Sequence, residues 1–147
     1  MSFANDLPKI IQLHQKYLSG EEGGEKANLC NADLYGANLA NVNLKGAALE
    51  GASLRRALLW KTDLEGALLA GANLKHAIAD GAIFKDADLR GACLKGVNLE
   101  HTDLRGANLL NADLMGASLA GATYDRHTIW PVNFNPAQSG TVDADQN

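Results

Sequence analysis

Histidine, cysteine and acidic side chains are the groups in this sequence that could carry chemistry, as metal ligands, nucleophiles or general acids and bases. The four histidines fall in different segments of the chain: His14, His76, His101 and His127. No serine or cysteine has a plausible histidine and acid as partners, and the glycines follow a turn period instead of a phosphate-binding motif. The sequence therefore predicts no catalytic residue, no metal site and no cofactor-binding residue, and hence no enzyme.

Asparagine and aspartate are placed more regularly, because they recur at multiples of five residues, for example at Asn28, Asp33, Asp63 and Asp113. Stacked carboxylates could form pairs for acid–base catalysis. A short polar side chain also bonds nearby backbone donors, however, and so braces a turn. Turn bracing explains the spacing without a cleft, and we interpret these residues as structural.

Residues 27–126 read as twenty consecutive units of five residues. The middle residue of each unit, its centre, is Leu in seventeen units, the exceptions being Ala79, Phe84 and Tyr124, and the first residue is Ala in sixteen. The last residue is Gly in eleven units and Asn in three, which are the residues that adopt positive φ most readily. A period of five fits neither a helix nor a strand, and it predicts a solenoid of short extended steps and turns.

The repeated pattern, A(D/N)LXX, resembles the pentapeptide-repeat family over 100 of the 147 residues. The resemblance implies an all-β solenoid, a right-handed quadrilateral β-helix in which four units make one coil, and therefore about five coils. Residue n then stacks over residue n+20. Because Ala79 and Phe84 are centres on adjacent sides of one coil, we predict that Phe84 points inward, into the space beside the small residue.

The flanking segments are predicted to close the two ends of the solenoid. In residues 1–26, a helix starting near Asn5 or Asp6 places Leu7, Ile10, Ile11, His14, Tyr17 and Leu18 on one face, followed by a glycine-containing link. Open solenoid ends expose core and strand edges, so we expect this helix to be an N-terminal cap. Residues 127–147 break the repeat and are predicted to form a C-terminal cap, with a disordered tail from about residue 138. Trp130 could instead belong to a dimer contact.

Two sets of surface residues are candidate binding sites. In the middle units the position before the centre is apolar in place of Asn or Asp, and with a neighbouring tryptophan this set comprises Leu58, Trp60, Leu68, Ile78 and Ile83. An exposed apolar patch suggests a protein contact, although such side chains could also lie flat and cover turns. The second set is a basic stripe of Arg55, Arg56, Lys75 and Lys95, which could meet phosphate or an acidic partner or could be an ordinary solvated face.

Composition narrows the functional classes further. The net charge is −4, and the repeat itself is close to neutral, with ten basic and eleven acidic residues. The sequence has no apolar run long enough for a membrane helix and no recognisable signal peptide, which predicts a cytoplasmic protein without a membrane partner. Cys30 and Cys93 are predicted to lie three coils apart, too far for a disulfide, and free thiols fit a reducing compartment.

The sequence therefore predicts a non-enzymatic structural or binding module that presents flat β-helix faces to a protein partner, as a monomer or a homodimer and without a cofactor. The alternative implied by the family is a DNA-mimicking inhibitor or protector of a type II topoisomerase, gyrase. Such members need a long, strongly acidic rod, and the near-neutral repeat with its basic stripe argues against that role. The same charge balance gives no reason to expect nucleic acid as a partner.

Overall fold

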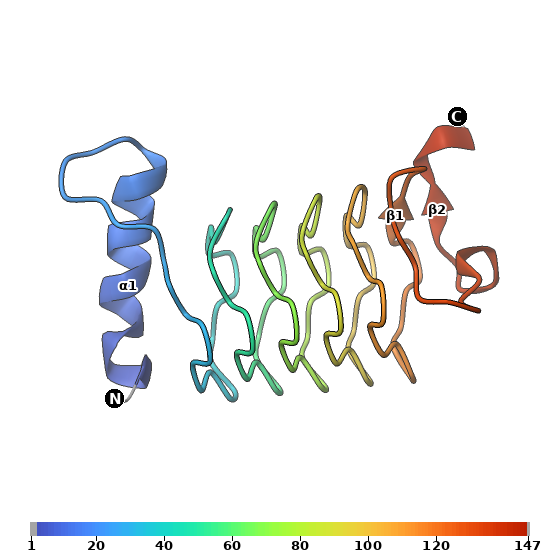
Figure 1. Cartoon of the computed structure of the whole chain (residues 1–147), viewed down its shortest axis with the longest axis horizontal. Helices are drawn as coiled ribbons and strands as arrows, with labels where there is room; N and C mark the ends of the chain where they lie inside the picture. The colour runs from blue at the N-terminus through green and yellow to red at the C-terminus, as the bar shows by residue number, and fades with distance from the viewer. Residues whose placement is uncertain (1–2, 147) are drawn as a thin grey trace.

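The computed structural model describes residues 3–146. Helix α1 spans Phe3–Leu18, the short strand β1 spans Thr123–Tyr124, and β2 spans Val142–Asp143, with 3₁₀ helices at Pro136–Gln138 and Ala144–Gln146. Between α1 and β1 the chain winds through a stack of similar coils, and α1 lies across one end of this stack (Figure 1). β1 and β2 pair in parallel at the opposite end.

One coil contains twenty residues, as the family resemblance implies. Parallel bridges join second-position residues that lie twenty apart, from Asn28 with Ala48 to Asp103 with Thr123. The backbone bonds that flank them are short, for example 2.7 Å from Leu29 N–H to the Ala48 carbonyl oxygen. Because a turn interrupts every five residues, the pairing consists of isolated bridges and not of long strands.

The four sides of the coil are named here by their units. Face 1 contains the units that begin at residues 27, 47, 67, 87 and 107, and face 2 those that begin at 32, 52, 72, 92 and 112. Face 3 contains the units that begin at 37, 57, 77, 97 and 117, and face 4 those that begin at 42, 62, 82, 102 and 122. Residues in the same position of successive units on one face stack over each other, as the bridges show.

The core is a set of stacked leucines lined by alanines. Sixteen of the seventeen leucine centres are buried, and Leu114 is only partly buried. Phe84 and Ala79 are both 0% exposed, which confirms that Phe84 points into the core. The large ring and the small methyl group occupy successive centres of one coil, so their combined volume is close to that of the two leucines found elsewhere.

Every turn between units from Asn31 to Gly121 uses a left-handed residue at the fifth position. Gly36 has a φ of 65°, and non-glycine residues adopt the same conformation, for example Arg56 with 57°. The left-handed region is costly for residues with a β-carbon. These residues keep the left-handed conformation because the backbone hydrogen bonds to the neighbouring coils hold each turn in place.

The Asn and Asp side chains brace these turns, as predicted. In all eleven units that carry them, the Oδ1 atom accepts the backbone N–H two residues later. Asn73, for example, accepts the N–H of Lys75 at 3.0 Å. The recurrence of short polar residues is therefore explained by local backbone bonding, and it supplies no acid–base pair.

Replacing Asn73 by alanine is expected to lower the free energy of unfolding by about 0.5–1.5 kcal/mol, because the Lys75 N–H loses its acceptor. The reciprocal change Ala48→Asn introduces the same brace at an unbraced second position, and it should raise stability by a similar or smaller amount. Urea unfolding followed by circular dichroism measures both. A change in the same direction on both substitutions would contradict the bracing role.

Helix α1 packs over the first coil through one face. Leu7 and His14 are buried, Ile10 and Ile11 pack against the core, and Tyr17 remains 47% exposed. The helix begins at Phe3 and not near Asn5 or Asp6, so that Pro8 lies inside it. The predicted apolar face therefore contacts the coil, with Tyr17 as its most exposed member.

The twenty-residue register ends after β1. Asn108 pairs with Ile129, twenty-one residues later, and Thr123 pairs with Val142, nineteen residues later. The chain after β1 thus pairs with the last unit of face 1 at Ile129 and with the last unit of face 4 at Val142. Between these two residues it leaves the stack, through the 3₁₀ helix Pro136–Gln138. The segment from 138 to 146, for which the sequence predicts disorder, instead contains β2 and the 3₁₀ helix Ala144–Gln146, because β2 pairs with the free edge of β1.

Candidate functional site

The candidate apolar residues divide among three faces. Leu58 and Ile78 form a bridge on face 3, and Trp60 lies in the same unit as Leu58. Ile83 belongs to face 4 and is bridged to Asp63, while Leu68 belongs to face 1, two sides of the coil away. The structure therefore brings Leu58, Trp60 and Ile78 together, and we call these three residues the face-3 surface.

The face-3 surface is open to solvent. Ile78 is 44% and Trp60 is 40% exposed, and Leu58 is partly buried. The Lys61 ammonium lies 5.4 Å from the centroid of the Trp60 ring, a cation–π distance. Asp80 and His101 follow at the edge of the same face, with 3.1 Å between His101 Nδ1 and Asp80 Oδ1. An apolar centre with a charged rim is the usual anatomy of a protein contact.

Three members of the basic stripe form a column on face 2, and the fourth, Arg56, lies at the turn that follows Arg55. Arg55, Lys75 and Lys95 occupy the same position in successive coils, and backbone bonds at the next position join these coils, such as Arg56 N–H to the Lys75 carbonyl. Its outer members are engaged by neighbours. The Arg55 guanidinium lies 5.5 Å from the centroid of the Tyr35 ring, and Lys95 Nζ lies 3.5 Å from an oxygen of Asp113.

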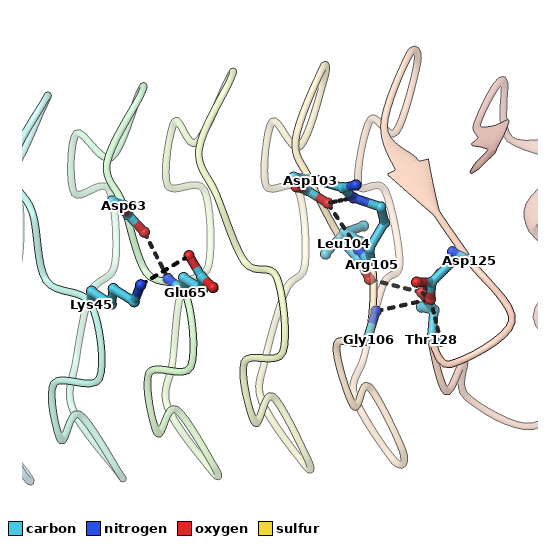
Figure 2. A network of polar contacts seen from close by, with 9 residues as sticks. All are labelled: Lys45, Asp63, Glu65, Asp103, Leu104, Arg105, Gly106, Asp125 and Thr128. Carbon is cyan, nitrogen blue, oxygen red and sulfur yellow. Dashed lines mark hydrogen bonds and ion pairs between the residues drawn. The ribbon is translucent and has the colours of Figure 1, made fainter. Parts of the chain in front are cut away.

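Face 4 carries a column of alternating charge, and Figure 2 shows its polar contacts. Lys45 pairs with Glu65 at 3.6 Å across one coil, and Arg105 forms a bidentate pair with Asp103 on its own unit, the shorter contact being 2.6 Å. Although burial raises the pKa of Asp103, the hydrogen bonds and charge of Arg105 outweigh it and lower that pKa. Such partly exposed pairs contribute little to stability, and this face is a solvated surface.

The side chain of Asp125 replaces one backbone acceptor in the ladder of face 4. Its Oδ1 accepts the N–H groups of Gly106 and His127, each at 3.0 Å, and the N–H of Thr128 at 3.2 Å (Figure 2 shows the contacts with Gly106 and Thr128). In earlier coils a backbone carbonyl occupies this place, as Lys85 does for Gly66. The Asp125 carboxylate thus takes the place of this carbonyl at Gly106, just before the register changes to twenty-one residues at Ile129. Burial raises the pKa of Asp125, but these donors lower it overall.

The remaining chemistry-bearing residues do not converge. Cys30 donates to Glu50 at 3.1 Å, and this bond raises the pKa of the thiol. Cys30 and Cys93 form no disulfide. Within residues 3–146, no group of histidine, cysteine and acidic side chains is placed to hold a metal ion.

His14 has an environment that sequence reasoning missed. Its side chain is 0% exposed, its Nδ1 accepts the Ala27 N–H at 3.0 Å, and its Nε2 lies 3.0 Å from the Lys45 carbonyl oxygen. Since Nδ1 is an acceptor, the ring is neutral and carries its proton on Nε2. Burial lowers the pKa of His14, assisted by the charge of Lys26 and opposed by the bond to Lys45. In the sequence, only the position of His14 on the apolar face of the helix indicated this environment.

A groove of about 380 Å³ lies at the C-terminal end of face 2. Its walls come from the last unit of that face and from the segment that leaves the stack: Ala112, Asp113, Leu114, Met115, Pro131, Val132, Asn133 and Phe134. Met115 and Val132 are the most exposed of its large apolar side chains, at 70% and 78%. Phe134 stacks on Trp130 with 4.9 Å between ring centroids, which fixes the outer wall.

The repeat also matches a known family model. The model for pentapeptide repeats matches residues 25–60, 49–86, 61–96 and 92–123, which together span most of the chain. The chain belongs to the pentapeptide-repeat family. Membership implies the right-handed quadrilateral β-helix that the resemblance predicts, and it agrees with the twenty-residue coil. No curated protein matches the sequence at a significant level.

Solved structures similar to this pentapeptide-repeat protein come from cyanobacteria and elsewhere. Rfr23 from Cyanothece 51142 is 28% identical, with 88% of this chain and 99% of that chain covered and a TM-score of 0.44. A pentapeptide repeat protein from Nostoc is 35% identical, with 90% and 93% covered and a TM-score of 0.27. QnrB1, a plasmid-mediated fluoroquinolone resistance protein, is 16% identical, with 79% and 81% covered and a TM-score of 0.42.

No helix within residues 3–146 of this pentapeptide-repeat protein combines the length and the apolar character needed to cross a bilayer. Helix α1 spans 16 residues and is amphipathic, with its apolar face turned towards the first coil.

Proposed function

We propose that this pentapeptide-repeat protein is a non-enzymatic binding module that docks a partner protein on the face-3 surface. The proposal rests on the apolar pair Leu58 and Ile78, which are bridged between adjacent coils beside Trp60. Leu58 is partly buried, and Ile78 is 44% exposed. In this reading residues 27–126 form about five coils, 1–26 form the N-terminal cap with its linker, and 127–147 form the C-terminal cap. Leu68 and Ile83 lie on other faces and are not part of the proposed contact.

The physical argument rests on what these positions hold elsewhere. On the same face, Asn38 and Asn98 occupy the second position, and each accepts a turn N–H. Leu58 and Ile78 have no side-chain acceptor and leave their turns unbraced. They also expose apolar surface to water, which lowers the favourable free energy of folding. A feature that costs stability at two stacked positions is best explained by binding, and tryptophan is frequent at the energetic centre of protein contacts.

The double substitution Leu58→Asn/Ile78→Asn tests this proposal without destroying the fold. It restores the usual residue at both positions, so we expect the free energy of unfolding to stay unchanged or to rise by up to about 1 kcal/mol. Binding of a partner captured from lysate of the source organism should weaken at least about tenfold, as loss of a contact centre does. Titration of that partner measures the change in Kd.

Ala48→Asn is the matched control, since it makes the same kind of change at the second position of face 1. It should leave partner binding unchanged. The proposal is wrong if the double variant binds the partner as wild type does. A loss of stability by more than about 1 kcal/mol would instead assign Leu58 and Ile78 to folding.

The topoisomerase alternative is disfavoured by the surface charge. A mimic of DNA needs acidic faces, whereas face 2 carries the column of Arg55, Lys75 and Lys95. We therefore propose a protein partner other than gyrase, and we do not propose nucleic acid. The unpaired thiols of Cys30 and Cys93 support a reducing compartment such as the cytoplasm. The chain would act there as a monomer or a homodimer.

A further inference from the structure

The groove at the end of face 2 lies where the next coil is missing. Between the two preceding units, three backbone bonds join the coils: Asp113 N–H to the Ala92 carbonyl at 3.0 Å, Leu94 N–H to the Asp113 carbonyl at 2.8 Å, and Gly96 N–H to the Met115 carbonyl at 2.9 Å. The chain turns away before it can repeat this pattern over the last unit.

The last unit of face 2 therefore keeps an open edge. Among residues 3–146, the N–H groups of Leu114 and Gly116 have no acceptor and the carbonyl of Ala112 has no donor, although their equivalents one coil earlier are all bonded. These three groups point along the stack with the spacing of the ladder. They match an extended chain that offers two carbonyls, two residues apart, and one N–H.

The core is incomplete at the same place. Leu114 is the one leucine centre that is only partly buried. The groove above it, of about 380 Å³, has apolar walls from Met115 and Val132 and one charged member, Asp113, which is paired with Lys95. A single apolar side chain at the central position of an incoming unit would complete this column, as Leu94 does for Leu74.

We propose that this groove is a binding site for an extended peptide segment of another protein, which adds a β-bridge to the last coil and places an apolar side chain on Leu114. The occupant continues the ladder that already joins the coils, so its hydrogen-bond pattern and its central apolar residue are set by the preceding unit. A second copy of this chain is a poor occupant, because within residues 27–126 its own units are already built into coils. This site is independent of the face-3 surface.

The probe is a blocked, fluorescein-labelled ten-residue peptide of two repeat-like units, ANLKGANLKG, added to the full-length protein. We expect saturable anisotropy with half-saturation below about 1 mM. The matched peptide ANSKGANSKG has the same charge and lacks the apolar centres, and it should bind at least about tenfold more weakly. Equal binding of the two peptides, or no saturation, overturns the proposal.

Two substitutions test whether the peptide binds in this groove. Met115→Glu changes an exposed groove residue and should weaken binding at least about tenfold, whereas Tyr35→Glu changes the first residue of the same column, at the other end of the rod, and should not. Circular dichroism checks that both variants fold. Leu58→Asn/Ile78→Asn should also leave peptide binding unchanged, so failure here and failure of the face-3 surface are distinguishable. Equal weakening by Tyr35→Glu contradicts the site.

Amide exchange by NMR gives the direct readout. In the free protein, the Leu114 and Gly116 amides should exchange at least about a hundred times faster than those of Leu94 and Gly96, because only the latter pair is bonded. The peptide should protect Leu114 and Gly116. If both amides are already protected and the protein sediments as a dimer, a second copy covers the groove and the proposal fails.

Discussion

Phe84→Ala is expected to lower the free energy of unfolding by about 3–5 kcal/mol, because the ring is 0% exposed and the surrounding coils are closed by backbone bonds on both sides. The neighbouring coils cannot collapse into the void without breaking these bonds. Urea unfolding followed by circular dichroism measures the loss. Replacement of the exposed Tyr35 by alanine should change the free energy of unfolding by less than about 0.5 kcal/mol. A small effect at Phe84 would contradict its place in the core.

The pairing of Phe84 with Ala79 gives this prediction a sharper form. Ala79→Leu alone overfills the coil and should cost about 1–3 kcal/mol. Combined with Phe84→Leu it restores the leucine pair found in most coils, so the double variant should be more stable than the sum of the single changes by at least about 1 kcal/mol. Strict additivity would show that the two centres do not share one space.

His14→Leu is expected to cost about 2–4 kcal/mol, because it leaves the Ala27 N–H and the Lys45 carbonyl oxygen without their buried partner. These two bonds connect helix α1 to the start of the first coil and to face 4. Loss of them should loosen the helix before the coils, so amides in α1 should exchange faster than those of the stack. His127→Gln, at an exposed histidine, is the control and should have little effect.

The same histidine makes stability depend on pH in a defined direction. Burial lowers the folded-state pKa of His14 below its ordinary value of 6.5, so the unfolded chain binds the proton more readily than the folded chain. The contribution of the neutral ring is complete above the unfolded pKa of 6.5 and is lost as the pH falls from there towards the folded pKa. The positive charge of Lys26 also lowers the pKa of His14, because it disfavours the protonated ring. Unfolding at pH 7.5 and 5.5 should show a larger decrease for wild type than for His14→Leu.

The frame of the repeat made most of the fold predictable. The five-residue spacing predicted the turns. The resemblance to the pentapeptide-repeat family implied the stacked leucines and the inward Phe84, because each unit meets only its neighbours in adjacent coils. The same spacing separates Leu68 from Leu58, because their units lie two sides of the coil apart, so the two residues do not share one surface. What the frame could not predict depends on contacts outside the period. The two bonds of His14 and the role of Asp125 come from segments that carry no repeat.

The C-terminal segment shows the same limit. Polar composition after residue 138 predicts disorder, but β2 needs only a backbone edge, and β1 offers one at any side-chain composition. The open groove at the end of face 2 was equally unpredictable from the sequence, because it results from the chain leaving the stack early and not from an unusual residue. Leu114 reads in the sequence like every other leucine centre.

Because one coil contains twenty residues, the length of a segment determines on which face the residues after it lie. Deletion or insertion of five residues rotates all later units by a quarter turn about the axis of the solenoid. Deletion or insertion of twenty residues changes the length of the rod and leaves the later units on the same faces. A five-residue deletion between Leu58 and Ile78 would preserve the core and still carry these two side chains to different sides of the protein. Among relatives that share a face-dependent activity, length differences between the contact residues should therefore occur in multiples of twenty.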